Sequence, residues 1–290
     1  MSLHHLQRLA EHYIQNDKDV AANYLPSLHI LRKDTVTAFE ASVYNPVICL
    51  ILQGRKETHI GQHSVSLGQG DALLVSHDLP VVAKITEASP TAPYLALILA
   101  LDIGMVRSLY EQVGEAVSQA SDAKSLAVCT ADATLLDPLA RYLRLIDRPL
   151  DAEVLGPLIL KEIHFQLLMS PIGGMLRNLQ SLDSHASRIA KAITRIRAGF
   201  REPLIVADLA DMAGMSQSSF HEHFKSITGT TPLQYQKDLR MIEAQRLLAG
   251  GMHSVSNAGF DVGYESPTHF SRDYSRKFGC SPKHHLAQTR

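Results

Sequence analysis

The sequence predicts an α+β protein in which an N-terminal antiparallel β-barrel with flanking helices is followed by an all-α domain of two helix-turn-helix units joined by a long helix. Three observations lead to this prediction. Short β-rich runs separated by turn residues fill residues 28–102. After Ile103 the apolar period changes from about 2 to about 3.6 residues. An internal repeat then occupies the last hundred or so residues.

The β-rich segment is interrupted by turn residues at close intervals. Its runs are LHILRK, VICLILQ, KETHI, HSVSL, ALLVS, VVAKIT and YLALILAL, and Gly54, Gly61, Gly68 and Gly70 lie between them. This spacing is typical of an antiparallel sandwich or a small barrel. The alternation shows which positions share a face of a strand but not which face lines the interior, so we assign no ligand contacts.

Helices are expected at 103–117, 134–146 and 151–169, where the apolar period is helical. The third helix mixes an apolar stripe, which includes Leu155, with polar positions such as Glu162. Two interpretations stay open for it. It either packs on the barrel or pairs with a second copy of the chain.

A candidate linker follows these helices. The segment SPIGGMLRNLQSLDSHAS is rich in Pro, Gly and Ser, which favours a connection between domains. We therefore expect an N-terminal domain at 1–172, a linker at 173–186 and a C-terminal domain at 187–290.

The internal repeat is the most informative feature of the chain. GMSQSSFHEHFKSITGTTP at 214–232 and GYESPTHFSRDYSRKFGCSP at 263–282 share one frame at a spacing of 50 residues. The aligned pairs are Ser216 with Ser266, Phe220 with Phe270, Phe224 with Tyr274, Gly229 with Gly279, and Pro232 with Pro282. Five anchors in register indicate two copies of one structural unit.

In the first unit, residues 206–232, Gly214 supplies the left-handed turn and Ser216 caps a new helix. The preceding helix is expected to turn Leu209, Ala210 and Met212 inward, and Phe220, Phe224 and Ile227 form a buried stripe on the new helix. Its opposite face is polar and resembles a surface offered to the major groove. The predicted DNA-binding residues there are Gln217, Ser218, His221, Glu222 and Lys225.

The second unit, residues 254–282, repeats this logic with Gly263 at the turn, Ser266 as the cap and Pro267 at the first helical position. Phe270, Tyr274 and Phe278 are expected to point inward. The predicted DNA-binding residues are Thr268, His269, Ser271, Arg272 and Arg276. Arg272 suits a bidentate contact with guanine, whereas Arg276 and Lys277 suit phosphate.

One long helix is expected between the units. PLQYQKDLRMIEAQRLLAG opens at Pro232, closes at Gly250 and spans about 17 residues, hence roughly 25 Å. Successive major grooves on one face of DNA are about 34 Å apart, so a stiff connector of this size suits two recognition helices in adjacent grooves.

Charge follows the same division of the chain. Residues 1–182 hold 14 Lys and Arg against 19 Asp and Glu, a net charge of -5, whereas residues 183–290 hold 14 against 10, a net charge of +4. The positive half is the one that carries the repeat, as expected of a nucleic-acid-binding domain.

These residues closely resemble the signature of the AraC/XylS family of transcription regulators. VGYESPTHFSRDYSRKFGCSP and LADMAGMSQSSFHEHFKSITGTTPLQYQKDLR carry the resemblance, and YNPVICLILQGRK, SHDLPV and PYLALILALD resemble the sensor half of one subgroup. The resemblance implies a cupin-like sensor or dimerisation domain at 1–172 and a DNA-binding domain at 187–290. Glu222 departs from the basic residue common in the family, which puts the base preference of the first unit in doubt.

The resemblance also implies the partners. They are double-stranded DNA, a small-molecule effector, RNA polymerase and a second copy of the chain in a homodimer. The effector, the operator and the direction of regulation stay open. No cofactor and no catalytic residue is expected.

The sequence offers two enzyme alternatives. A cupin-type metalloenzyme fused to a DNA-binding module is suggested by His59, His63 and His77, but no HxH pair exists. Alkyl transfer to a cysteine would need an activated thiolate, and Cys49 and Cys129 lie in apolar surroundings. We therefore expect a regulator that is not an enzyme.

The sequence favours the cytoplasm. No run approaches the roughly 18 to 20 apolar residues needed to cross a bilayer, and MSLHHLQRLAEHY lacks the apolar stretch of a secretion signal. The widely spaced cysteines indicate neither disulfides nor a thiolate zinc site.

Overall fold

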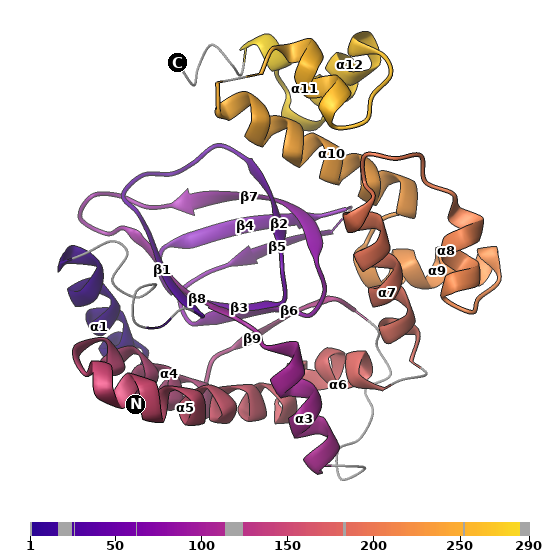
Figure 1. Cartoon of the computed structure of the whole chain (residues 1–290). Coiled ribbons are helices and arrows are strands. Elements are labelled where there is room, and N and C mark those ends of the chain that lie inside the picture. The colour runs from indigo at the N-terminus through magenta and orange to yellow at the C-terminus, as the bar shows by residue number, and fades with distance from the viewer. Residues whose placement is uncertain are drawn as a thin grey trace.

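A computed structural model of the chain describes residues 2–16, 25, 27–61, 63–113, 124–181, 184–251 and 253–284. An N-terminal domain of two sheets with helices on one side is followed by a helical C-terminal domain (Figure 1). The strands are β1 (Leu28–Lys33), β2 (Glu40–Tyr44), β3 (Val47–Gln53), β4 (Arg55–Ile60), β5 (His63–Leu67), β6 (Asp71–Val75), β7 (Leu79–Glu87), β8 (Tyr94–Ala100) and β9 (Leu126–Thr130).

The strands form two antiparallel sheets within the described ranges. One has the order β1-β8-β3-β6-β9 and the other β2-β7-β4-β5. Because consecutive strands often lie in different sheets, the chain passes repeatedly between the two layers, as in a jelly roll. The predicted barrel-like N-terminal domain is confirmed, although the two sheets are not closed into one ring.

The central strand β3 is buried on both faces. Ile48, Leu50 and Leu52 point toward the helices, while Cys49 and Ile51 point toward the second sheet. Successive side chains of a strand alternate between faces, so odd positions of β3 line the interior between the sheets. The structure thereby decides which face is the lumen, a question that the alternation alone left open.

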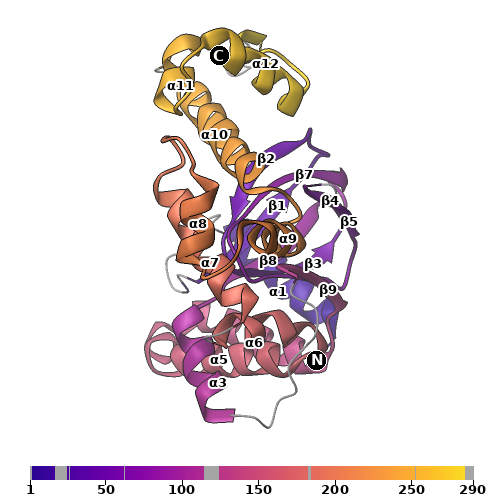
Figure 2. The same ribbon diagram turned by 90° about the vertical axis from the view of Figure 1, so that its right-hand side faces the viewer.

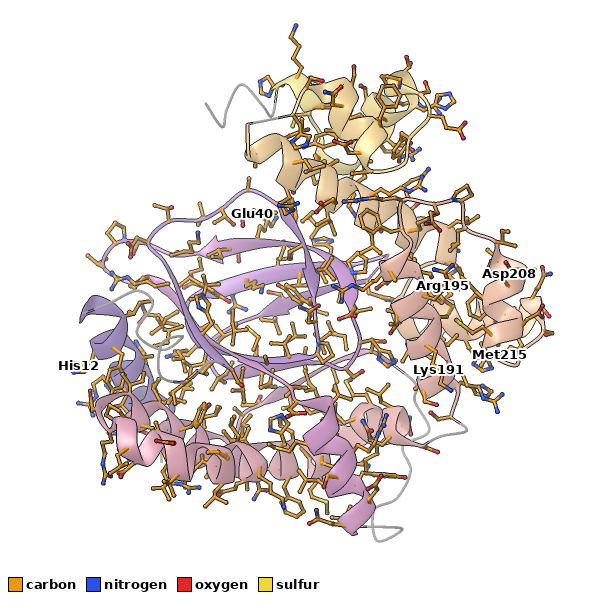
Figure 3. The ribbon with its side chains drawn as sticks, in the orientation of Figure 1. His12, Glu40, Lys191, Arg195, Asp208 and Met215 are labelled. Carbon is orange, nitrogen blue, oxygen red and sulfur yellow. The ribbon has the colours of Figure 1, made fainter. Side chains whose placement is uncertain are left out.

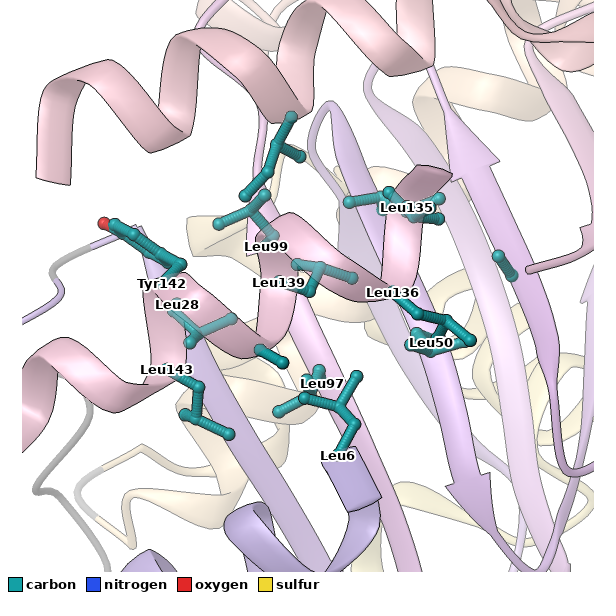
Figure 4. Close-up of a cluster of buried hydrophobic side chains, with 14 of the residues drawn as sticks. Leu6, Leu28, Leu50, Leu97, Leu99, Leu135, Leu136, Leu139, Tyr142 and Leu143 are labelled. Atoms are coloured by element: carbon teal, nitrogen blue, oxygen red, sulfur yellow. The ribbon is translucent and has the colours of Figure 1, made fainter. Parts of the chain in front are cut away.

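Helices cover the outer face of the five-stranded sheet. Leucines of α4 pack against Leu50, Leu97 and Leu99 of the sheet in one apolar cluster (Figure 4). The helices of this layer are α1 (Leu3–Asn16), α3 (Ile103–Val113), α4 (Ala133–Leu143) and α5 (Pro149–Met169), with a 3-10 turn at Arg144–Asp147. The three predicted helices are confirmed, and residues 114–117 of the first lie outside the described residues.

Helix α5 packs on the sheet domain, the first of the two interpretations that the sequence left open, and the second, pairing with another copy, remains a prediction. Ile159 and Ile163 are buried in the cluster, while Leu150, Val154 and Leu158 are exposed on the other side. These three residues are four apart and share one helix face. The helix therefore packs on the sheet domain and also presents an apolar stripe to the outside.

The segment expected as a linker is largely helical. Within 173–186 lies α6 (Gly174–Gln180), whose Met175 and Leu176 are buried in the same cluster as α4 and α5. The composition was misleading because the Gly and Ser residues flank a short apolar helix. Residues 174–180 of the expected linker are therefore helical and pack on the sheet domain, and the bounds of the linker and of the domains remain a prediction.

The C-terminal domain contains two apolar cores. Its helices are α7 (His185–Ala198), α8 (Val206–Met212), α9 (Gln217–Thr228), α10 (Pro232–Ala249), α11 (Val255–Asp261) and α12 (Pro267–Phe278). The core of the first unit contains Phe220 and Phe224, and that of the second contains Phe270 and Tyr274. Helix α10 contributes to both.

Helix α7 was not predicted from the sequence. Ser184 caps it by accepting from the Ser187 amide, and Ile189, Ile193 and Ile196 fill the first core. Its spacing of apolar residues at i, i+4 and i+7 was the signal that could have revealed it.

The helices on either side of the first unit, α7 and α10, hold it against the sheet domain. The Tyr235 hydroxyl donates to the carbonyl oxygen of Asp78 over 2.6 Å, and Arg197 forms an ion pair with the Asp78 carboxylate. Arg197 also donates to Asn45 over 3.0 Å. Figures 1 and 2 show α10 passing over β2 and β7, with the second unit further from the sheets.

No helix among the described residues has the length and apolar character needed to cross a membrane.

Two buried histidines are held in their neutral form. His164 accepts from the Asp102 amide through Nε2 and donates from Nδ1 to the Leu160 carbonyl. His77 lies between the domains, with Ser76 and Ser125 at Nδ1 and the Ala186 carbonyl at Nε2. Burial lowers the pKa of both imidazoles below their ordinary value of 6.5.

We predict that the free energy of unfolding falls as the pH drops from 7.5 to 5.5. The unfolded chain takes up protons at His77 and His164 below about pH 6.5, whereas the folded chain does not, so acid favours the unfolded state. Urea unfolding across this pH range measures the effect. His164→Gln should make the dependence shallower, and His29→Gln, at an exposed position, is the control for removing one imidazole. A wild-type stability that is level or rises toward pH 5.5 contradicts the prediction.

Candidate nucleic-acid interface

The first unit has the predicted helix-turn-helix geometry. Gly214 adopts a φ of 62° between α8 and α9, and the Ser216 hydroxyl accepts from the Ser219 amide to begin α9. Phe220 and Phe224 are fully buried. Leu209 and Ala210 of α8 are buried as expected, but Met212 is exposed, so its predicted inward position is wrong. Met212 ends the short α8, where the chain already turns away from the core.

The second unit repeats this geometry. Gly263 adopts a φ of 87°, and the Ser266 hydroxyl accepts from the His269 amide to begin α12. Phe270 and Tyr274 are fully buried, whereas Phe278 at the end of the helix is only partly buried. Equivalent glycines, Gly229 and Gly279, end both helices in the left-handed conformation.

The predicted contact residues lie on the solvent side of their helices. On α9 they are all exposed: Gln217, Ser218, His221, Glu222 and Lys225. On α12 the exposed ones are Thr268, His269, Arg272 and Arg276, while Ser271 is partly buried. Each helix thus buries an aromatic stripe and presents a polar one, the division that a recognition helix needs.

The basic residues of α12 differ in how far they are neutralised. Arg276 pairs with Asp273 over 2.7 Å but its side chain is 64% exposed. Lys277 pairs with Asp238 of α10 over 2.8 Å, and its side chain is 21% exposed. Arg272 is exposed and has no ion-pair partner among the described residues. The ammonium of Lys277 therefore links α12 to α10, which argues against its predicted phosphate role.

Asp273 anchors α12 to α10. It accepts from Lys237 over 3.0 Å and from the Tyr264 hydroxyl over 3.1 Å. Burial alone would raise the pKa of the Asp273 carboxyl, but these hydrogen bonds and the nearby Arg276 hold its pKa below the usual range. The carboxylate stays charged and sets the position of α12 on α10.

Arg240 of α10 has a structural role that the sequence did not indicate. Its guanidinium donates to the Phe200 carbonyl over 2.7 Å and to the Gly263 carbonyl over 2.9 Å. It also donates to the carbonyls of Arg201 and Glu202. One side chain therefore ties the loop after α7 to the turn of the second unit.

Lys225 is placed differently from the rest of its helix face. It lines a cavity of about 490 Å³ between the C-terminal helices and the hairpin formed by β4 and β5. At the same contact, a Cβ at Gly61 of that hairpin would overlap the carbonyl oxygen of Gly229. The end of α9 that carries Lys225 thus faces the sheet domain across this cavity, and Lys225 itself stays exposed. Asp208 and Met215 lie at the far edge of the first unit (Figure 3).

The three histidines that suggested a metal site have separate surroundings. His59 pairs with Glu57 over 2.7 Å on the outside of β4, and His63 is exposed at the start of β5. His77 is buried between the domains, as described above. Within the described part of the chain no three His, Cys, Asp or Glu side chains are grouped to hold a metal ion. The geometry gives the metalloenzyme alternative no support.

Two family models match the chain. A model of the AraC-type transcriptional regulator N-terminus matches residues 24–175, just over half of the chain. The chain belongs to the AraC family. A helix-turn-helix domain model matches residues 209–288. The first model covers the sheet domain and the second covers both helix-turn-helix units, the order in which Figure 1 shows these domains.

Individual relatives agree with this family. The chain is 37% identical over 101 residues to the HTH-type transcriptional regulator AlkR of Acinetobacter baylyi, covering 35% of this chain and 33% of AlkR. It is 30% identical over 125 residues to the HTH-type transcriptional activator RhaS of Escherichia fergusonii, covering 42% and 44%. The chain thus matches less than half the length of these curated relatives.

A solved structure shares the whole fold. ToxT of Vibrio cholerae with a bound unsaturated fatty acid matches with a TM-score of 0.53 and 13% sequence identity, covering 90% of this chain and 93% of that chain. At this identity the match shows the fold of this AraC-family protein and nothing about its ligand.

We predict that Gly263→Ala destabilises the protein by about 2 to 4 kcal/mol. Its Cβ would overlap the Arg201 carbonyl, and alanine disfavours a positive φ. The matched control is Gly251→Ala, where φ is 72° but no atom lies within 4 Å of the added Cβ, so about 1 kcal/mol is expected. Urea unfolding gives both values, and equal losses would mean that the close approach at Gly263 does not matter.

Proposed function

We propose that this AraC-family protein is a sequence-specific transcription regulator whose two recognition helices, α9 and α12, enter adjacent major grooves of one DNA site. One observation carries the proposal. Two Ser-capped helices, α9 and α12, have the same buried aromatic stripe and the same polar outer face. Both are connected to one helix, α10, which has 18 residues and is about 27 Å long. Such a connector suits the roughly 34 Å spacing of major grooves.

The proposed DNA contacts are the polar residues of these two helices. Arg272 reads a base edge, because it is exposed and not paired with an acid. Arg276 contacts phosphate, since its side chain extends into solvent beyond Asp273. The remaining proposed contacts are Gln217, Ser218, His221, Glu222, Lys225, Thr268, His269 and Ser271.

We propose that the N-terminal domain senses a small-molecule effector and controls the first unit through the docking contact. Lys225 lies against the sheet domain, and Arg197 and Tyr235 hold the first unit to Asp78. A change in this docking would alter how much of α9 is free for DNA. The ToxT structure with a bound fatty acid is a precedent for a small molecule in this fold.

RNA polymerase and a second copy of the chain are further proposed partners. The exposed stripe of Leu150, Val154 and Leu158 on α5 supports the homodimer, because an apolar stripe of this kind suits a helix-to-helix contact. The proposed place of action is the cytoplasm, where bacterial DNA is regulated.

We predict salt-dependent binding of the full chain to duplex sites obtained by selection from random DNA. Gel shifts at increasing salt should show a steep loss of affinity, because cations of the C-terminal domain neutralise phosphates. Arg272→Ala should weaken binding to the best site by about 1 to 3 kcal/mol and relax preference at one base position.

Two variants serve as controls for Arg272. Arg272→Lys keeps the charge but loses the bidentate geometry, so it should keep the salt slope and lose the base preference. Arg8→Ala, at an exposed position on α1 of the N-terminal domain, should change neither the salt slope nor the base preference. Unaltered sequence preference in both Arg272 variants would show that this residue reads no base, and the absence of any salt slope would count against the function itself.

We predict that Glu222→Arg tightens binding to non-selected DNA and steepens the salt dependence by about one phosphate contact. The substitution removes an acid and adds a cation on the proposed DNA face of α9. Base preference under the first unit should shift as well. Glu153→Arg makes the same charge change on the exposed face of α5 and should leave all three measurements as in the wild type. If the two variants behave alike, Glu222 does not face DNA.

A further inference from the structure

A cavity of about 660 Å³ lies between the two sheets of the N-terminal domain. Its walls come from β1, β2, β3, β7 and β8, together with Lys56 of β4. Most of the lining is apolar and includes Leu31, Val47, Ile85 and Ile98. A cavity of this size is typical of small-molecule sites, which pair an apolar wall with a few polar groups.

Lys56 is a buried cation facing this cavity. It is only 7% exposed, and its ammonium lies 4.9 Å from the centre of the Tyr44 ring. Among the described residues no carboxylate forms an ion pair with it. Lys84, another lysine of the cavity wall, is in contrast paired with Glu57 over 3.0 Å. Lys56 has the neutral Tyr44 side chain as its hydrogen-bond partner. A buried ammonium without a counter-charge is costly, and an anion that enters the cavity would compensate it.

Tyr94 adds a second unsatisfied polar group to the same cavity. Its side chain is fully buried, and its hydroxyl has no hydrogen-bond partner of normal geometry among the described residues. Its polar neighbour is the Cys49 thiol, a weak hydrogen-bonding group. Burial raises the pKa of both the Cys49 thiol and the Tyr94 phenol, so both are neutral and neither supplies a counter-charge to Lys56.

We propose that this cavity binds a small monocarboxylate with an apolar body, its carboxylate held by Lys56 and the Tyr94 hydroxyl. Lys33 and Glu40 also line the cavity but are exposed, and Lys84 is paired with Glu57. The buried part of the wall thus offers one cation without a counter-charge and one neutral donor, which match a single negative charge better than a phosphate dianion. The apolar body would contact Val47, Ile85 and Ile98. This assignment rests on the proposed role of the N-terminal domain as the effector sensor, and it names the chemical class of that effector.

Strand β2 connects this cavity to the DNA-binding domain. Tyr44 of β2 lies under the Lys56 ammonium, while its neighbour Val43 packs against the core of the first unit. Asn45, directly after β2, accepts from Arg197 of α7. A carboxylate at Lys56 would draw the ammonium from the Tyr44 ring and so act on the strand that carries the docking contacts.

The test is isothermal titration of the full chain with two acids and their neutral counterparts, dodecanoate against 1-dodecanol and 4-phenylbutanoate against 4-phenyl-1-butanol. We expect at least one acid to bind at least tenfold more tightly than its alcohol. Lys56→Met, which keeps the length of the side chain and removes the charge, should abolish this preference. Lys84→Met removes a charge at the same cavity that already has a partner, and it should keep the preference.

The proposal is overturned if neither acid binds, if acid and alcohol bind equally, or if the preference survives in Lys56→Met. Should that variant fail to fold, Tyr94→Phe decides, because it removes only the hydroxyl: weaker binding of the acid supports the site and unchanged binding overturns it. Gel shifts with selected DNA on the same preparations distinguish a failure of the proposed ligand site from a failure of the proposed DNA-binding function. If the wild type binds DNA but neither acid, only the proposed ligand site is overturned. If the wild type shows no salt-dependent DNA binding, the proposed function is overturned as well.

Discussion

The arrangement of the C-terminal domain depends on helix α10. Tyr235 and Leu239 at its start belong to the core of the first unit, and Met241 and Leu248 further along belong to the core of the second. Arg240, between these two sets, donates to carbonyls next to both units. Because one continuous helix is shared by two cores, α10 sets the separation of the two units along its axis.

The same helix brings the sheet domain into this arrangement. Tyr235 reaches from the first core to the Asp78 carbonyl, and Arg197 of the neighbouring α7 pairs with the Asp78 carboxylate. Strand β2 completes the connection, since Val43 packs on the first unit and Tyr44 faces the cavity between the sheets. The first unit therefore shares contacts with the sheet domain, while the second packs on α10 and on the loop after α7, where Gly263 approaches the Arg201 carbonyl. The proposed control of DNA binding through the first unit rests on these contacts.

The repeat could be predicted from sequence because its signals are local. The helix cap needs only a Ser that accepts from the amide three residues later, and the turn needs only a glycine at positive φ. The buried stripe needs only aromatic residues four apart on one helix. Local signals did not reveal the contacts that distant segments make. Lys277 was expected at phosphate but meets Asp238, which is 39 residues away, and the Gly-rich segment at 174–180 became a helix because Leu176 reaches the sheet domain's core.

The sequence by itself determined the order of the domains, the two helix-turn-helix units and the family, because caps, turns and period are properties of neighbouring residues. Only the tertiary structure decided which side of each strand faces the lumen. Side chains of a strand alternate between its two faces, so Cys49 and Ile51 had to lie on the same face. Which of the two faces is interior depends on the strands from elsewhere in the chain that pair and pack with it. The burial of Lys56 beside Tyr44 and Tyr94 arises in the same way, from strands β2, β4 and β8 that meet only in the fold.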